Sequence, residues 1–244
     1  MCFANGNVEI TDQEMREAIS LVNCQGYAAL ALPAQVELSL GRTLYKAMDA
    51  QTFHPHRQRY YNEIAFFWPD DWLDVESGVG AFHEQKSLPY IMPVEEARKL
   101  LNEKLGAMHA EAILNFALQL KQLVVHNHHG LENNELRLAR VMVRQMNETD
   151  HTSHSGADLH EDVGYSDRPY SQLLSVIVTT HGITTESKIY QPKVGELLVF
   201  NAYDRRKRLG LDESFAFLHK GPRTGPKMFF FFEFLGRRIE ADQN

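Results

Sequence analysis

The stretch "DLHEDVGYSDRPYSQLLSVIVTT" (158–180) places His160 and Asp162 two positions apart, shortly before an apolar run. In an extended strand, side chains two positions apart lie on the same face. An imidazole and a carboxylate on one face can bind a metal ion together, and such a site needs at least one further ligand. The stretch therefore predicts part of a metal site at the entry to a region of strands.

The sequence around this stretch predicts helices in the first half of the chain and strands in the second. Turn residues separate six strand-like segments, which are 136–147, 170–182, "SKIYQP" (187–192), "GELLVFNAY" (195–203), "SFAFLH" (214–219) and "PKMFFFFEFLG" (226–236). Within the last of these, "FFFFEF" (229–234) lacks alternation, as expected for a strand that is covered on both sides.

Helical patterns are expected over 11–24, 34–50 and from 94 to about 125, with a break near Gly106. A short strand is expected at 27–33, and residues 51–92 are expected to be irregular and rich in aromatic side chains. The order predicts an α+β, mainly β fold, with a β-sandwich or barrel-like core and helices against one outer face.

Composition limits the classes of function. The chain has 244 residues, of which 43% are hydrophobic, and this suits a single domain, 1–244, with a helical and irregular part at 1–130 and a β core at 131–238. No apolar run approaches the ~20 residues of a membrane span, and no secretory signal is visible. A net charge of −7 argues against nucleic acid as the main partner. We therefore expect a cytoplasmic protein, whose oligomeric state the sequence does not indicate.

His219 is the candidate for the missing metal ligand, because it ends an apolar strand and could face His160 and Asp162 from a neighbouring one. Two imidazoles and one carboxylate on a single face leave three positions open and favour non-haem Fe(II) oxygen chemistry. A structural zinc site would instead have four protein ligands, usually including thiolates, and neither of the two cysteines is near. The alternative is that Asp162 caps a turn and His160 is an ordinary, partly buried histidine.

The other histidines are less informative. His151, His154 and His181 are candidates for contacts around the metal ligands or with a substrate. The rest are expected to be surface histidines, with His54 and His56 in one loop and His126, His128 and His129 in one turn.

Residues 136–236 resemble the Fe(II)/2-oxoglutarate-dependent dioxygenase superfamily, in which a double-stranded β-helix (jelly-roll) core carries HxD and a distal histidine. The resemblance implies that His160, Asp162 and His219 bind Fe(II), and that 2-oxoglutarate and dioxygen are the cosubstrates. It implies hydroxylation, desaturation or ring formation at an unactivated C–H bond of a small molecule, such as an amino acid or its derivative.

The resemblance also implies a cation near the start of the last strand, where it pairs with the distal carboxylate of 2-oxoglutarate. Both Lys227 and Arg223 match this role. On the strand before HxD, Arg140, Arg144 and Asn147 are candidates for further cosubstrate contacts. The alternative for Arg140 and Arg144 is that they occupy outward positions on a half-exposed strand.

Possible anchors for the substrate lie in "FHPHRQRYYNE" (53–63), which offers Arg57, Arg59, Tyr60 and Tyr61. Two other functions remain open. One is a cupin-like isomerase or hydrolase that uses the same metal ligands without 2-oxoglutarate, and the other is a non-catalytic binding domain.

Overall fold

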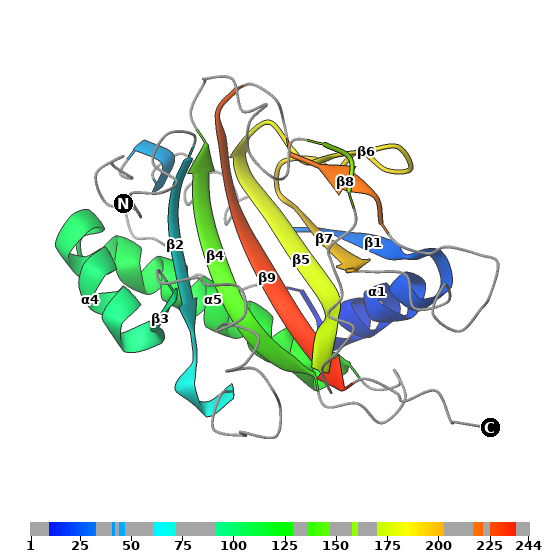
Figure 1. Cartoon of the computed structure of the whole chain (residues 1–244), viewed down its shortest axis with the longest axis horizontal. Coiled ribbons are helices and arrows are strands. Elements are labelled where there is room, and N and C mark those ends of the chain that lie inside the picture. Colours follow the sequence, from blue (N-terminus) through cyan, green and yellow to red (C-terminus); the bar gives the residue numbers. More distant parts are fainter. Residues whose placement is uncertain are drawn as a thin grey trace.

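The structure is a computed structural model. It describes residues 10–32, 41, 44–46, 61–71, 91–128, 136–146, 158–160, 170–202, 217–221 and 225–237. Figure 1 shows helices behind a broad twisted sheet, and a small second sheet in front of it.

The chain enters the fold through a helix and an edge strand. Helix α1 (Asp12–Gln25) begins at a capping box, in which Thr11 and Glu14 exchange side-chain and backbone hydrogen bonds. It ends at Gly26, whose φ of 89° is the left-handed conformation that glycine adopts at little cost. Strand β1 (Tyr27–Ala31) follows, so the helix and strand predicted here are confirmed.

Two further helices confirm the predicted break near Gly106. Helix α4 (Val94–Leu105) and helix α5 (Ala107–Asn127) are separated by this glycine, which has a φ of 83°. The buried side chains of α5 include Phe116, whose ring centroid lies 4.9 Å from that of Phe230 in the sheet. The long helix therefore packs against the centre of the sheet.

The large sheet has seven strands in the order β1-β7-β5-β9-β4-β2-β3. Its remaining strands are β2 (Tyr61–Phe67), β3 (Ile91–Pro93), β4 (Arg137–Met146), β5 (Tyr170–Gly182), β7 (Glu196–Asn201) and β9 (Lys227–Arg237). Neighbouring strands are antiparallel except β2 and β3, which pair in parallel.

The expectation that residues 51–92 are wholly irregular is wrong for β2 and β3. Strand β2 has the sequence "YNEIAFF", in which two polar residues, Asn62 and Glu63, are followed by four apolar ones. Polar and apolar residues therefore do not alternate along it. Its Glu63 is buried and pairs with an arginine of β4. A charge that is buried through pairing hides the strand pattern, because pattern rules assign charged residues to the solvent.

The small sheet consists of β6 (Glu186–Ser187) and β8 (His219–Lys220), to which His160 adds an isolated antiparallel bridge. Of the predicted strand 187–192, only Ser187 is in a strand. From β4 onward the chain alternates between the sheets: β4 is in the large sheet, His160 in the small one, β5 in the large one, and so on to β9. This alternation is the double-stranded β-helix predicted from the sequence.

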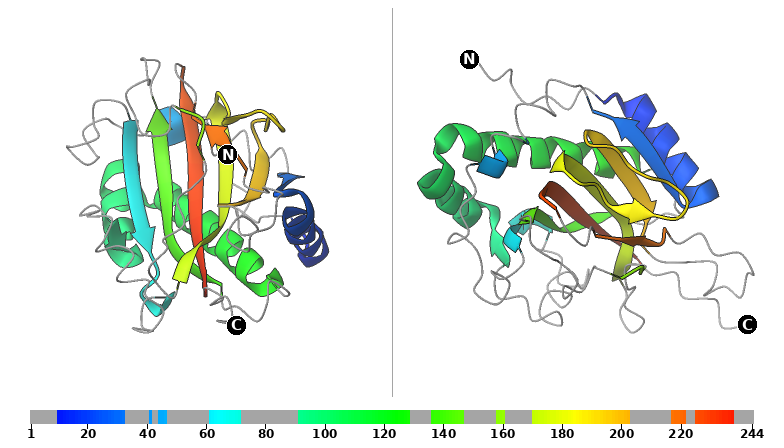
Figure 2. Two further views of the ribbon diagram at one scale, coloured as in Figure 1. Left: turned by 45° about the vertical axis from the view of Figure 1, so that its right-hand side comes forward. Right: turned by 90° about the horizontal axis from the view of Figure 1, so that it is seen from above.

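The large sheet separates two apolar layers, and Figure 2 shows α1, α4 and α5 along only one of its faces. Alternate residues of β9 divide between the layers, as expected for a strand covered on both sides. Met228, Phe230, Phe232 and Phe234 belong to the helix-side layer. We call the opposite face the inner face; its apolar residues are Ala65, Met142, Met146, Ile177, Leu198, Phe200, Phe229 and Phe231, and Phe217 packs against them.

In the part of the chain that the structure describes, no helix combines the length and the apolar character needed to cross a lipid bilayer.

Candidate metal and cosubstrate site

His160 and His219 lie side by side in the small sheet. The backbone N–H of each donates to the carbonyl oxygen of the other, and both N···O distances are 2.9 Å. Their ring centroids are 4.6 Å apart. A strand pair with this register places both side chains on one face, close enough to reach a single ion. The two histidines, 59 residues apart in the sequence, are thus brought together as predicted.

Both imidazoles are oriented in the same way by their own backbone. The Nδ1 atom of His160 lies 2.7 Å from the carbonyl oxygen of Asp158, and that of His219 lies 3.0 Å from the carbonyl oxygen of Phe217. A carbonyl oxygen only accepts, so each Nδ1 must donate its hydrogen. In the neutral ring, Nε2 then carries the lone pair, and metal-binding histidines are commonly oriented by such second contacts.

Aromatic side chains hold His219 in place. Its ring centroid lies 4.9 Å from that of Phe200 in β7 and 6.0 Å from that of Phe217. His219 is buried, whereas His160 is partly exposed. The pair therefore lies where the small sheet meets the inner face of the large one.

The third predicted ligand, Asp162, lies outside the described residues, as do Asn147, Arg223, Arg57, Arg59 and Tyr60. Among the described residues, no group of three histidine, cysteine, aspartate or glutamate side chains is placed to bind a metal ion. The structure thus describes two of the three predicted ligands and brings them together.

Lys227 is the first residue of β9 and is buried on the inner face. Its Nζ donates to Oγ1 of Thr185 at 2.9 Å and lies 4.4 Å from the centroid of the Phe229 ring. No carboxylate among the described residues lies within ion-pair distance of this ammonium. A buried cation with a neutral hydroxyl as its partner is costly, and it favours a site for an anion.

The pKa of Lys227 reflects this environment. Burial, and to a lesser degree the charge of Arg144, lower the pKa from 10.5 to about 7, while Glu186 opposes the shift. Ionisable groups with strongly shifted pKa values are concentrated at functional sites. A bound anion would stabilise the protonated form and raise the pKa again.

The anion site and the histidine pair are near each other in the fold. Lys227 is bonded to Thr185. Two residues after Thr185 along the chain is Ser187, which pairs with His219 in the small sheet. Two residues of strand span about 6.6 Å. A small dicarboxylate could therefore contact the ammonium with one end and a metal bound to the histidines with the other.

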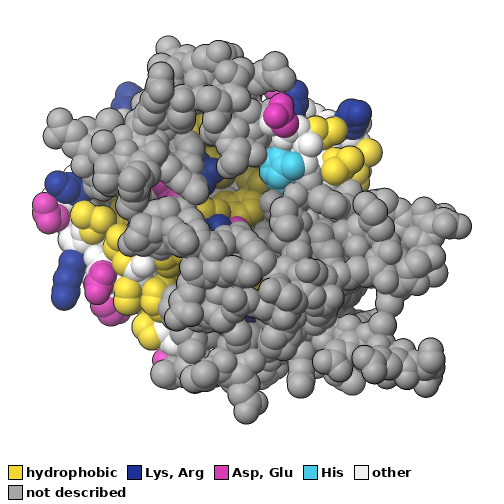
Figure 3. All heavy atoms as spheres, viewed as in Figure 1, with side chains coloured by type: hydrophobic (Ala, Val, Ile, Leu, Met, Phe, Trp, Pro, Cys, Tyr) yellow, Lys and Arg dark blue, Asp and Glu magenta, His cyan; other side chains and the backbone are white. Residues whose placement is uncertain are grey.

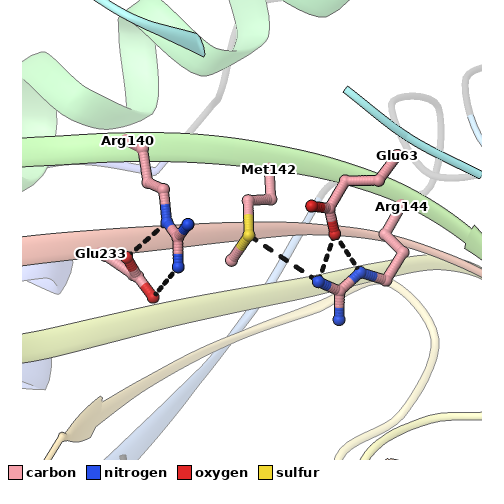
Figure 4. A network of polar contacts seen from close by, with 5 residues as sticks. All are labelled: Glu63, Arg140, Met142, Arg144 and Glu233. Carbon is pink, nitrogen blue, oxygen red and sulfur yellow. Dashed lines mark hydrogen bonds and ion pairs between the residues drawn. The ribbon is translucent and has the colours of Figure 1, made fainter. Parts of the chain in front are cut away.

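Arg144 lies beside Lys227 on the inner face. It forms an ion pair with Glu63 of β2, with Nε 2.5 Å from Oε2 (Figure 4). Its guanidinium also lies 5.6 Å from the centroid of the Phe229 ring. Further along β4, Arg140 is paired with Glu233 of β9. The interpretation of Arg140 and Arg144 as outward residues is therefore wrong, because both are turned inward and neutralised by buried glutamates.

The partners of the cations could not be identified from the sequence. Thr185 belongs to an ordinary polar segment, and Glu63 lies in a segment without strand periodicity. Phe229 could have been placed, because it is two residues after Lys227 on the same strand and must share its face.

Figure 3 shows a hollow in this side of the molecule, with hydrophobic, cationic and anionic side chains inside it and a histidine near its edge.

Histidine positions outside the pair have other surroundings. The ring centroid of His181, near the end of β5, lies 4.6 Å from that of Tyr45. The expectation that His126 and His128 are surface histidines of one turn is wrong, because His126, though exposed, lies on α5, and His128, just after the helix, is buried. His151 and His154 lie outside the described residues. The predicted contacts of His181 with a substrate remain a prediction.

No protein-family model matches the sequence, and no curated protein matches it either. A solved viral collagen prolyl hydroxylase from Paramecium bursaria Chlorella virus-1 is 13% identical, with a TM-score of 0.43, over 90% of this chain and 99% of that chain. An oxidoreductase of the 2OG-Fe(II) oxygenase family from Burkholderia pseudomallei is 13% identical, with a TM-score of 0.44, and the match covers 90% of this chain and 89% of that chain. A prolyl 4-hydroxylase from Phytophthora capsici is 10% identical, with a TM-score of 0.49, and the match covers 100% of this chain and 70% of that chain.

Proposed function

We propose that the chain is an Fe(II)- and 2-oxoglutarate-dependent oxygenase. The observation that carries the proposal is the combination of two paired histidines, whose Nδ1 atoms both lie against backbone carbonyl oxygens, and a buried ammonium held by Thr185, two residues before the strand partner of His219. Each element alone is common. Their arrangement, with the histidines in the small sheet and the lysine on the inner face of the large sheet, matches the needs of one metal and one dicarboxylate.

The donor set fits a ferrous ion. Imidazole nitrogens suit iron, and two histidines with one carboxylate leave open positions for a cosubstrate and dioxygen. His160 and His219 would provide the nitrogens, and Asp162, two residues beyond His160, would provide the carboxylate. When bound, Fe(II) with 2-oxoglutarate supplies the oxidising chemistry, since such reactions belong to the cofactor rather than to the protein.

The protein side of the reaction is binding and orientation. Lys227 would bind the distal carboxylate of 2-oxoglutarate, and Thr185 would hold the ammonium in place. Phe229 would exclude water from the same pocket, which strengthens the ion pair by lowering the local dielectric. Arg144 and the predicted Asn147 would complete the polar wall on β4. Between the two candidate cations, we favour Lys227 over Arg223 because of its burial and its position on the inner face.

The substrate is proposed to be a small molecule, and the reaction a hydroxylation, desaturation or ring formation at a C–H bond. We do not expect nucleic acid or a membrane as a partner, and a cytoplasmic location fits the sequence. The buried ammonium disfavours a cupin-like isomerase or hydrolase, because such an enzyme has no dicarboxylate to neutralise it.

Turnover of 2-oxoglutarate tests the proposal. Purified protein with Fe(II), 2-oxoglutarate and air should release succinate slowly even without substrate. Succinate release should stop when either iron or oxygen is removed. A protein that binds iron but releases no succinate above the buffer with iron alone would favour one of the two other functions. A matched control is the same protein treated with a chelator.

A further inference from the structure

Arg140 and Glu233 form a buried, two-pronged ion pair on the inner face. Nε of Arg140 lies 2.5 Å from Oε2 of Glu233, and Nη2 lies 2.7 Å from Oε1. The two side chains are only 6% and 5% exposed. Figure 4 shows this pair and the Arg144–Glu63 pair on the two sides of Met142. The pair is thus separate from the residues around Lys227.

Bulges on both neighbouring strands occur at the level of this pair. The register of β4 against β9 shifts between Leu138 and Arg140, and that of β5 against β9 shifts between Gln172 and Leu174. Leu138 belongs to the helix-side layer, although it is two residues from Arg140 and would share its face in a regular strand. The bulge therefore turns Arg140 inward, and bulges that redirect a side chain are frequent beside active sites.

Packing alone does not require charges at this point. Three adjacent inner-face positions are apolar, namely Met142 on β4, Ile177 on β5 and Phe231 on β9, and the position opposite Glu233 is the small, uncharged Ser175. Replacing a buried ion pair by well-packed apolar residues is often neutral or stabilising, because desolvation of the charges offsets their attraction. An arginine turned by a bulge into this layer, beside a glutamate of opposite charge, points to a role in binding.

The position of the pair relative to His219 suggests what it binds. Glu233 is opposite Ser175 of β5, and Ser175 is opposite Phe200 of β7, whose ring packs against His219. Two strand spacings correspond to about 10 Å. Lys227 lies six residues away along β9, which corresponds to about 20 Å. The pair and Lys227 therefore lie at different levels of the inner face, and the pair is linked to His219 through Ser175 and Phe200.

We propose that Arg140 and Glu233 bind the zwitterionic end of a free α-amino acid substrate, an inference that rests on the proposed function. The guanidinium would bind the α-carboxylate, and the glutamate would accept hydrogen bonds from the α-ammonium. A guanidinium matches the two oxygens of a carboxylate, and a carboxylate accepts charge-assisted hydrogen bonds from an ammonium. The pair is neutral overall, which matches a ligand that carries one charge of each sign.

A binding experiment with three matched sets of compounds tests this inference. The protein, loaded anaerobically with Fe(II) and 2-oxoglutarate, is titrated by calorimetry with L-amino acids. The same titrations use the corresponding amines, which lack the carboxylate, and the 2-hydroxy acids, which lack the ammonium. We expect at least one amino acid to bind, and its two analogues to bind at least about 100-fold more weakly, because each leaves one member of the pair unmatched.

The double variant Arg140→Met/Glu233→Leu separates binding from stability. It should keep the melting temperature and the 2-oxoglutarate affinity of the wild type, and lose at least about 100-fold in amino acid affinity. Amino acid affinity unchanged in the double variant would overturn the inference, and so would a wild-type protein that binds no amino acid. Should the double variant not fold, the analogue series on the wild type still decides.

Failure of the proposed function gives a different result. A protein that does not bind 2-oxoglutarate in the presence of iron contradicts the oxygenase proposal, whatever happens with amino acids. A protein that binds 2-oxoglutarate normally but shows no preference for amino acids over the corresponding amines contradicts only the inference about Arg140 and Glu233.

Discussion

Replacing His219 by alanine is expected to weaken Fe(II) binding at least about 100-fold. Changing a residue that merely orients a metal ligand costs 10- to 100-fold in affinity, and removal of a ligand should cost more. The measurement is anaerobic calorimetry with Fe(II), or with Mn(II) as an oxygen-stable substitute. His160→Ala should give a loss of similar size, because the two rings lie side by side and Nδ1 of each lies against a backbone carbonyl oxygen.

The control for this prediction is His126→Ala, which removes an exposed imidazole from α5. It should bind Fe(II) as the wild type does. Since His219 packs against Phe200 and Phe217, its alanine variant is also compared by melting temperature. A folded His219→Ala protein with unchanged Fe(II) affinity would show that this histidine is not a ligand.

Replacing Lys227 by methionine should remove most of the affinity for 2-oxoglutarate while leaving Fe(II) binding unchanged. Truncation of one partner of a buried charge pair costs about 2–5 kcal/mol, which corresponds to a loss of roughly 30-fold or more. Lys121→Met is the matched control, because that lysine lies on α5 over Trp68, away from the inner face. Equal 2-oxoglutarate affinities in the wild type and the Lys227 variant would assign the cosubstrate to another cation.

The same lysine predicts the pH dependence of binding. In the free protein the pKa of Lys227 is lowered to about 7, chiefly by burial, and a bound carboxylate raises it. Affinity for 2-oxoglutarate should therefore be highest below pH 7 and fall as the pH rises above it, with uptake of a proton on binding in that range. Lys227→Arg stays protonated, so its affinity should lack this decline. A decline shared by both proteins would have to arise from another group.

The parts of the fold that the sequence predicted are those governed by local periodicity. The break at Gly106, the strands β4, β5, β7 and β9, and the two-sided burial of "FFFFEF" follow from apolar patterns and glycine positions. The pairing of His160 with His219 was expected from the family resemblance and from placing His219 at the end of the strand 214–219. The placement was wrong, because Phe217 and Leu218 are not in a strand and His219 is the first residue of β8. Lys227 was predicted from its place at the start of the last strand, and the structure adds its burial.

The features that were missed depend on contacts between distant segments. Strand β2 was not recognised because its Glu63 is buried through a pair with Arg144, 81 residues away. The inward direction of Arg140 depends on a bulge. The extra residue of the bulge turns the following side chain to the other face of the sheet, and the local composition gives no sign of it. Both errors arose from assigning charged residues to the solvent.

Absorption spectroscopy under anaerobic conditions tests the central claim most directly, because it reports iron and 2-oxoglutarate bound together at one centre. Purified protein with Fe(II) should develop a weak visible charge-transfer band when 2-oxoglutarate is added, and the band should be absent from His219→Ala at the same concentrations. A wild-type protein with demonstrably bound iron and saturating 2-oxoglutarate that shows no such band would contradict the account.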